Sequence, residues 1–375
     1  MSVTVKIPIF HLLLADNMKD FTDEFPLTSE YIYLNTASCG LLSKSLVEWR
    51  HQHDMNLMRG GSMFRDLHKA HIREIRSEVG RFFSTSESNI ALVPNFSFGL
   101  NSVLDGLTKG RKVLLLKGDY PSVSWPIENR DFDICYAEIN EHLEENIAAA
   151  VAEHQPDVFA FSVVQYISGI LIDLEFLKNL KTNHPQLLLI ADGTQFLGTQ
   201  NFNFEESAID IIGGSNYKWM LSGYGNGIFM IKEKAQQLIT PKTIGFNSAD
   251  ATFSKRDAIE FVGRLEPGHQ DTINYGSLGE SIQFLNKLGK NEIETHLTSL
   301  KTKAKAAFEK LGLLQDSVVR RKDHSTIFNI KGDAHLFQKL KENGIVCSLR
   351  GNGIRVSFHI YNTEEDLEKL LALIG

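Results

Sequence analysis

A lysine in an apolar stretch is the residue of this sequence best suited to covalent chemistry. Lys218 lies between Tyr217 and Trp219, in a segment (213–227) that contains five glycines. Removal from water favours the neutral amine of a lysine, which is the nucleophilic form that a Schiff base requires. The alternative is a side chain that lies along apolar surface and keeps its amine in solvent.

An aspartate and a glutamine occupy positions from which they could act with this lysine. Asp192 follows the apolar run Leu187–Ile190, and Gln195 comes three residues later. Because ligands of α/β sheets collect beyond the carboxyl ends of the strands, Asp192 is a candidate catalytic carboxylate. An aspartate at such a place can equally cap the following turn.

Two further places in the sequence could bind anions. Phe96 and Ser97 follow the run Ile90–Val93 and precede a helical pattern, so backbone N–H groups and a hydroxyl could hold a phosphate. An ordinary serine N-cap is the alternative there. Arg350 and Arg355 flank a tight turn, and a guanidinium suits a carboxylate because it donates two parallel hydrogen bonds. The alternative is that these arginines keep an exposed edge strand soluble and bind no ligand.

Two other patterns do not indicate a functional site. The histidine pairs at 51 and 53 and at 68 and 71 have no Cys or carboxylate at ligand spacing, so we expect no metal site. The glycines of Gly223–Gly227 run into a strand-like segment and not a helix, which is the wrong context for a dinucleotide-binding fingerprint. A nucleotide-binding protein is therefore a weak alternative.

The elements that position these residues alternate between strands and helices over the first two thirds of the chain. This order predicts a mostly parallel sheet covered on both faces. The glycine-broken segment before the last run is too irregular for a crossover helix, so we expect that strand to be antiparallel. The strand-like runs are Ile90–Val93, Val113–Leu116, Ile134–Ala137, Val158–Phe161, Leu187–Ile190, Ile209–Ile212 and Ile228–Ile231.

From about residue 256 the pattern changes to that of a small α+β domain. Two long helical segments, Tyr275–Leu288 and Glu292–Leu311, precede three short strands and a final helix from about Glu364. The predicted strands are Thr326–Ile330, Ile345–Ser348 and Ile354–Phe358. We expect an N-terminal segment (1–28) that packs with the small domain, a large α/β domain (29–255) and a tightly joined C-terminal domain (256–375).

The composition is typical of a globular enzyme. The 375 residues are 42% hydrophobic and 23% charged, which excludes a disordered or fibrous chain. A net charge of −7 gives no electrostatic footprint for nucleic acid, and no basic run indicates a membrane surface. The three cysteines are too few and too scattered for a disulfide framework, and no segment has the pattern of a signal peptide or membrane span. We expect a soluble, cytoplasmic protein.

The candidate residues stand within motifs that occur in a known order from about residue 30 to the end of the chain. These motifs are Tyr33–Ser38, Asn95–Asn101, Ser162–Gln165 with Ser168–Gly169, Asp192–Gln195 with Gly198, Ser215–Lys218, Glu266–Gly268, and Ile354–Ser357 with Tyr361–Asn362. Together they resemble the class V aminotransferase family of fold type I pyridoxal-phosphate enzymes, which includes cysteine desulfurases, kynureninase and isopenicillin N epimerase. The resemblance implies a mostly parallel seven-stranded sheet with one antiparallel strand, plus a small α+β C-terminal domain.

The resemblance implies a role for each candidate residue around pyridoxal phosphate. Lys218 would form the Schiff base and carry the proton at the substrate Cα, while Asp192 would pair with the pyridine nitrogen. Gln195, or Gln165 as a second candidate, would approach the phenolic oxygen, and Tyr120 would stack on the ring. Arg355 would bind the substrate α-carboxylate, with Arg350 as its substitute and Asn35 beside the substrate. The phosphate would be held by the residues Phe96, Ser97, Ser215 and Tyr217.

Three departures from the family pattern bear on the reaction. The turn after Arg350 lacks the nucleophilic cysteine of desulfurases, and Cys347 falls within a predicted strand, where a buried inert thiol is expected. His269 stands where many relatives have a threonine that contacts the phosphate from the other subunit. Tyr217 replaces a histidine that is frequent in desulfurases. Cys39 is expected near the entrance of the active site.

The resemblance therefore implies an enzyme that acts at Cα of a small amino acid. Transamination, lyase-type elimination from cysteine or selenocysteine, and epimerisation all remain open. The alternatives are a catalytically silent protein that keeps the fold for binding or regulation, and a cysteine desulfurase with an atypically placed cysteine. A homodimer with active sites at the subunit interface is also implied.

Overall fold

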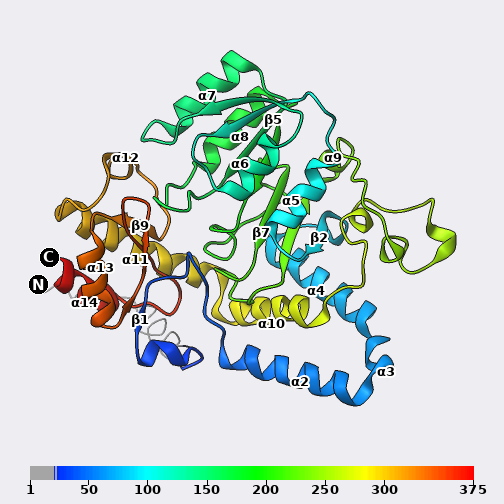
Figure 1. Cartoon of the computed structure of the whole chain (residues 1–375), viewed down its shortest axis with the longest axis horizontal. Helices are drawn as coiled ribbons and strands as arrows, with labels where there is room; N and C mark the ends of the chain where they lie inside the picture. Colours follow the sequence, from blue (N-terminus) through cyan, green and yellow to red (C-terminus); the bar gives the residue numbers. More distant parts are fainter. Residues whose placement is uncertain (1–20, 22) are drawn as a thin grey trace, which may run out of the picture.

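The computed structural model of the chain describes residues 21 and 23–375 (Figure 1). The part of the predicted N-terminal segment that comprises residues 1–20 and 22 lies outside the described residues. No helix in the described part of the chain has both the length and the apolar composition needed to cross a membrane.

The centre of the molecule is a seven-stranded sheet with the strand order β2-β8-β7-β6-β5-β3-β4. Only β8 runs antiparallel to its neighbours β7 and β2, and the other pairs in the sheet are parallel. This confirms the predicted sheet, including the reversed last strand. The strands are β2 (Ile90–Val93), β3 (Lys112–Leu116), β4 (Asp133–Ala137), β5 (Val158–Ser162), β6 (Leu188–Asp192), β7 (Ile211–Ser215) and β8 (Gly227–Ile231).

Helices cover both faces of this sheet, as the figure shows (Figure 1). Alternate residues of β3 enter different cores, because successive side chains of a strand point to opposite faces: Leu114 and Leu116 into one, Val113 and Leu115 into the other. α5 and α6 supply the second core, whereas α4, α7, α8 and α10 supply the first. The helices of this part are α2 (Lys44–Gly60), α3 (Ser62–Arg65), α4 (His68–Phe83), α5 (Phe96–Leu104), α6 (Pro121–Glu128), α7 (Leu143–His154), α8 (Leu174–Asn183), α9 (Glu233–Gln236) and α10 (Thr272–Leu288).

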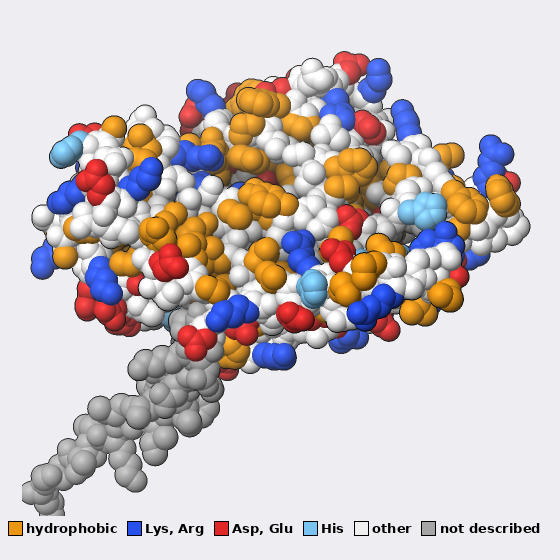
Figure 2. Space-filling model, turned by 60° about the horizontal axis from the view of Figure 1, so that its bottom comes forward, with side chains coloured by type: hydrophobic (Ala, Val, Ile, Leu, Met, Phe, Trp, Pro, Cys, Tyr) orange, Lys and Arg blue, Asp and Glu red, His pale blue; other side chains and the backbone are white. Residues whose placement is uncertain are grey.

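The helices α2 and α4 were not assigned from the sequence. Together with α10 they form a layer below the sheet, and α10 packs against both (Figure 1). On the face that carries α2 and α10, hydrophobic side chains are interspersed with charged ones (Figure 2). Met58, near the end of α2, and Met63, in α3, are exposed. α2 has a weak amphipathic pattern, since Leu46 and His53 are its buried positions, whereas α4 buries a regular apolar face that includes Ile75 and Val79.

The C-terminal region contains two small sheets and four helices. β11 (Ser348–Arg350), β12 (Gly353–Ser357) and β9 (Ile327–Ile330) form an antiparallel sheet with β12 in the middle, whereas β1 (Ile32–Tyr33) pairs in parallel with β10 (Ile345–Val346). The strand predicted over 345–348 is thus divided at Cys347, where the chain changes its pairing partner. The helices are α11 (Lys290–Lys310), α12 (Asp316–Val319), α13 (Ala334–Glu342) and α14 (Glu364–Ile374).

Short 3₁₀ helices complete the chain. They are η1 (Pro26–Ser29), η2 (Glu87–Asn89), η3 (Phe246–Ala249), η4 (Phe253–Lys255) and η5 (Val262–Arg264). After η5, Glu266 forms a bidentate ion pair with Arg76 of α4 at 2.8 Å and accepts a hydrogen bond from the Leu92 amide of β2 at 2.7 Å. This largely buried ion pair attaches the loop before α10 to the edge of the large sheet.

Candidate active site

The predicted site residues converge at the carboxyl ends of the parallel strands. Asp192 ends β6, Ser215 ends β7, and Phe96 begins the helix that follows β2. The strand register places Asp192 beside Gly213, and Ser215 beside Gly227. The sheet thus brings one carboxylate, one hydroxyl and one helix N-terminus to a common edge, as expected for an open α/β sheet.

Lys218 lies in the irregular segment between β7 and β8 and is only 6% exposed, which rules out the solvent-directed alternative. Its Nζ lies 5.4 Å from the centre of the Tyr217 ring and 5.8 Å from that of Tyr120. Burial lowers the pKa of Lys218 to about 8, with a smaller contribution from nearby arginines, and Asp192 opposes this shift. A neutral, nucleophilic amine is therefore accessible near neutral pH.

Asp192 holds the following turn, one of the two sequence alternatives, and also lies at the edge of the sheet where Lys218 is found. Its Oδ1 accepts a hydrogen bond from the Thr194 amide at 2.8 Å, so it holds the following turn. Burial raises the pKa of Asp192 to about 6, while the hydrogen bonds from Thr194 and the charge of Lys218 oppose this rise. A buried carboxylate that forms few hydrogen bonds is suited to pair with a protonated ring nitrogen.

The first turn of α5 and the end of β7 form the candidate phosphate cradle. The Phe96 amide donates to Ser215 Oγ at 2.9 Å, and Ser97 Oγ donates to Ser122 Oγ at 2.9 Å. The N-cap of α5 is Asn95, which accepts from the Phe98 amide, so Ser97 is not the cap. The alternative in which Ser97 is an ordinary N-cap is therefore excluded.

An open groove of about 620 Å³ adjoins this cradle. Ser97 and Tyr120 lie on its wall, together with Ser122 and the exposed indole of Trp125. Tyr120 is held by its own neighbour, since Asp119 Oδ1 accepts from the Tyr120 amide at 2.7 Å. Asp119 is buried and also accepts from the Ser162 amide at 2.7 Å, a positioning role that sequence reasoning missed. Its place in the turn shortly after β3 was the available signal.

Arg355 is a buried cation with unused donors. It is 1% exposed and lies on the central strand β12, which excludes the edge-strand alternative. Its Nη1 donates to the Tyr166 carbonyl at 2.7 Å, whereas Nε and Nη2 have no hydrogen-bond partner. Burial lowers the pKa of Arg355 to about 10. Because an unpaired buried donor is costly, the two free N–H groups fit an anionic ligand.

The glutamines and the asparagine predicted for the site mainly hold backbone segments together. Gln195 accepts from the Trp219 indole at 2.7 Å and donates to the Ala37 carbonyl at 2.9 Å. Gln165 Oε1 accepts from the amides at 167 and 168 at 2.8 and 2.6 Å. Asn35 Oδ1 accepts from Ser348 Oγ at 2.7 Å. Each of these bonds fixes a loop that borders the site.

Two aromatic pairs surround the lysine. The Tyr217 ring stacks on the Tyr224 ring at 4.4 Å, and Tyr120 meets Tyr166 edge to face at 5.1 Å. His269 is exposed in the loop before α10, and no hydrogen bond joins it to the cradle within the described chain. The structure thus brings most of the predicted residues together and leaves His269 apart from them.

Cys39 lies beside Lys218 because its loop packs closely on the lysine segment. The Gly40 amide donates to the Tyr217 carbonyl at 2.9 Å, and a Cβ on Gly40 would lie 2.0 Å from the Lys218 carbonyl oxygen. The thiol is half-buried. A hydrogen bond to Cys39, together with burial, raises the pKa of the Tyr224 hydroxyl.

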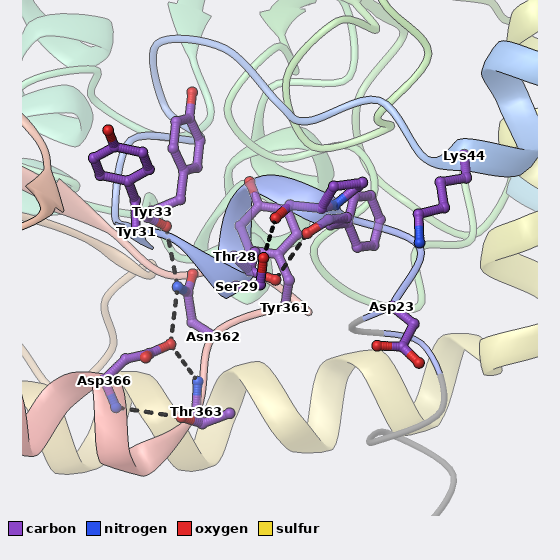
Figure 3. A pocket seen from close by; sticks show the side chains of 12 residues that line it. Asp23, Thr28, Ser29, Tyr31, Tyr33, Lys44, Tyr361, Asn362, Thr363 and Asp366 are labelled. Carbon is purple, nitrogen blue, oxygen red and sulfur yellow. Dashed lines mark hydrogen bonds between the residues drawn. The ribbon is translucent and has the colours of Figure 1, made fainter.

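Two tyrosine hydroxyls form hydrogen bonds with the loop that contains Cys39. Tyr33 and Tyr361 line a separate pocket of about 350 Å³, together with polar residues such as Lys44 and Asp366 (Figure 3). The Tyr33 hydroxyl donates to the Cys39 carbonyl at 2.7 Å, and the Tyr361 hydroxyl forms a hydrogen bond with Thr36. Lys218, Asp192 and Arg355 do not line this pocket, so it is distinct from the candidate active site.

His359 is a second positioning residue that the sequence did not reveal. It is fully buried, and its Nε2 donates to the Trp219 carbonyl at 3.0 Å. Burial lowers the pKa of His359 to about 3, so the ring is neutral. This bond attaches the C-terminal region to the residue after Lys218.

Comparison with known proteins places the chain in a family. The model of the family described as "Aminotransferase class-V" matches residues 36–370. The chain belongs to this family. A relative from Pyrococcus abyssi named "Probable cysteine desulfurase" is 22% identical over 95% of this chain and 96% of its own length.

Solved structures show the same fold. The apo structure of a cysteine desulfurase from Thermococcus onnurineus superposes with a TM-score of 0.82 at 19% identity, covering 100% of this chain and 98% of that one. A complex of the cystine C-S lyase C-DES with cysteine persulfide gives a TM-score of 0.82 at 19% identity, covering 93% and 98% of the two chains. A C-DES mutant with glycine covalently linked to its pyridoxal-phosphate cofactor also superposes, with a TM-score of 0.80 at 18% identity over 93% and 97% of the chains. The class V chain therefore has the fold type I architecture of pyridoxal-phosphate enzymes.

Proposed function

We propose that this class V chain binds pyridoxal phosphate through Lys218 and acts at Cα of a small amino acid. The observation that carries the proposal is the buried Lys218 amine between the carboxylate of Asp192 and two tyrosine rings. The residues present fit the cofactor. A cradle of N–H and hydroxyl groups suits its phosphate, and the carboxylate suits its ring nitrogen.

Each residue has a task that follows from its position. Bound pyridoxal phosphate would supply an electron sink for the carbanion at the substrate Cα. Arg355 would orient the substrate by binding its α-carboxylate with Nε and Nη2. The Lys218 amine, once free, would take the Cα proton and return it to carbon, since burial keeps its pKa near neutrality. Tyr120 and Tyr217 would exclude water from one side of the lysine.

Among reactions at Cα, one specific observation favours sulfur chemistry as a second candidate. Cys39 lies next to the lysine segment, which makes it a possible atypically placed nucleophile of a desulfurase. Cys347 does not suit this role, because it is buried and burial raises its pKa to about 11. Several relatives carry the name cysteine desulfurase, which is consistent with this candidate. Transamination and epimerisation use the same residues.

The proposal is tested by the visible spectrum of the protein with added pyridoxal phosphate, before and after borohydride. We expect a band that borohydride removes in the wild-type protein and that is missing in Lys218→Ala. As a matched control, Lys234→Ala removes an exposed lysine and should behave like the wild type. A wild-type protein that stays colourless would contradict the proposal and favour a catalytically silent binding protein.

Two further predictions accompany this function. The division into a large domain (29–255) and a small domain (256–375) stays a prediction, as does a homodimer with active sites at its interface. Exposed aromatic side chains close to the site, Phe98, Trp125 and Tyr224, support an interface there.

A further inference from the structure

Two arginines lie on the same face of one hairpin at the candidate active site. In the β11–β12 hairpin Ser348 pairs with Arg355, and Arg350 pairs with Gly353. Residues two apart on a strand share a face, so Arg350 lies diagonally across from Arg355, at a spacing of about 7–8 Å. The hairpin turn packs on the 165–168 loop, since a Cβ on Gly351 would lie 2.8 Å from Ile167.

The face of the hairpin that carries Arg350 and Arg355 lies near Lys218. Ser348, which stands directly opposite Arg355, donates to Asn35 of the loop that contains Cys39. Arg355 donates to the Tyr166 carbonyl next to Gln165. The charges of both arginines also disfavour the protonated form of Lys218. Two guanidinium groups therefore lie close enough to Lys218 for their charges to act on its amine.

The charge in this space is not balanced by the described protein. No Asp or Glu forms an ion pair with Arg350 or Arg355 among residues 21 and 23–375. Asp192 is committed to the turn at Thr194 and faces Lys218. A single α-carboxylate on Arg355 would leave the exposed Arg350 guanidinium without a partner. Two guanidinium groups on one face of the same hairpin match a ligand with two anionic groups.

We propose that the substrate of this site is an amino acid with a carboxylate on its side chain, whose α-carboxylate binds Arg355 and whose side-chain carboxylate binds Arg350. The inference rests on the proposed function and assigns Arg355 and Arg350 different tasks. Arg355 recognises any amino acid, because every amino acid has the α-carboxylate. Arg350 determines specificity, because a side-chain carboxylate pairs with its charge and a neutral amide of the same length does not.

The test compares acidic amino acids with their neutral amides. Dissociation constants of L-aspartate, L-asparagine, L-glutamate and L-glutamine are measured from the change in the visible spectrum of the pyridoxal-phosphate-loaded protein. We expect one acid to bind about tenfold more tightly than its amide, and we expect this preference to decrease with added salt. In Arg350→Gln the preference should disappear while the affinity for the amide changes less than about twofold. Arg350→Lys should restore part of it.

Control variants and a second measurement separate the possible failures. Arg59→Gln removes an exposed arginine at the end of α2, far along the chain from the hairpin, and should leave both affinities unchanged. Equal binding of acid and amide by the wild type, or an equal loss of both in Arg350→Gln, would overturn the proposal.

If no cofactor band forms, the proposed function fails, but calorimetry of the cofactor-free protein still decides the inference. There, succinate should bind more tightly than succinamate in the wild type and equally weakly in Arg350→Gln. No difference between succinate and succinamate in the wild type would refute the two-arginine site.

Discussion

The protonation state of Lys218 determines how fast this protein can bind an aldehyde cofactor. Burial among Tyr120, Tyr217 and the loop of Gly40 disfavours the ammonium form, and Asp192 limits this shift. The same low-dielectric surroundings raise the pKa of Asp192. The pKa values of the two groups therefore lie closer together than those of exposed residues of the same type.

The rate of covalent cofactor loading should therefore rise with pH. With a lowered pKa of about 8, the amine of Lys218 is mostly protonated below that value and mostly neutral above it. Because only the neutral amine attacks an aldehyde, the rate should increase about tenfold per pH unit below 8 and level off above it. Stopped-flow absorbance of pyridoxal-phosphate binding between pH 6 and 10 measures this profile. A rate that keeps rising to pH 10 would show that the burial of Lys218 does not lower its pKa.

At the scale of elements, the site depends on the close packing of two loops that are distant in the sequence. The 35–40 loop enters from β1, and the 216–221 segment connects β7 with β8. Gly40 permits their contact, because any side chain at this position would meet the Lys218 carbonyl. Tyr33 and Tyr361 then hold the loop from the other side.

Gly40→Ala should destabilise the protein and weaken cofactor binding. The added Cβ would lie 2.0 Å from the Lys218 carbonyl oxygen, so one of the loops must move. We expect a loss of about 1–3 kcal/mol in the free energy of unfolding. Urea denaturation and cofactor titration measure the two effects. Gly268→Ala is the matched control, because nothing lies within 4 Å of its Cβ position, and its stability should be unchanged or slightly higher. Equal stability of the two variants would contradict the close packing of these loops.

On the scale of the whole molecule, the C-terminal region supplies contacts that complete the site. Arg355 comes from β12, and His359 follows it and donates to the Trp219 carbonyl. The His359 ring packs edge to face on Trp219 at 5.1 Å and on Tyr361 at 5.5 Å. The large sheet and the small one are therefore joined through the segment that carries the lysine.

His359 should make the protein less stable in acid. Its pKa is lowered from 6.5 to about 3 in the folded state, so the unfolded chain binds a proton that the folded chain does not between these values. Stability from this group is present above pH 6.5 and decreases by about 1.4 kcal/mol per unit as the pH falls below it. Buried Asp192, with its raised pKa, contributes in the opposite direction, so a variant is needed to isolate the histidine.

Urea unfolding of His359→Gln from pH 7 to 5 measures this contribution. The slope of stability against pH should be smaller than in the wild type, by an amount that approaches about 1.4 kcal/mol per unit toward pH 5. His335→Gln, a change at an exposed histidine, should keep the wild-type slope. An unchanged slope in His359→Gln would mean that this ring is not buried in its neutral form.

The order and type of most elements could be predicted from the sequence, because periodicity and turn residues act locally. The runs that became β2 to β8 show this, as does the reversal of β8 after its glycine-broken segment. Asp192 and Phe96 were identified because each follows a strand-like run, and strand ends meet at one edge of a parallel sheet. Lys218 was identified from its apolar neighbours, and Ser215 from the family resemblance.

Only the tertiary structure decided which groups are left without partners. The unused donors of Arg355, the position of Arg350 beside it and the bond from His359 to Trp219 depend on contacts between distant segments. The same holds for the change of partner at Cys347, since a strand sequence does not encode its neighbour. Burial, and with it the pKa of Lys218, arises only when these segments exclude water together.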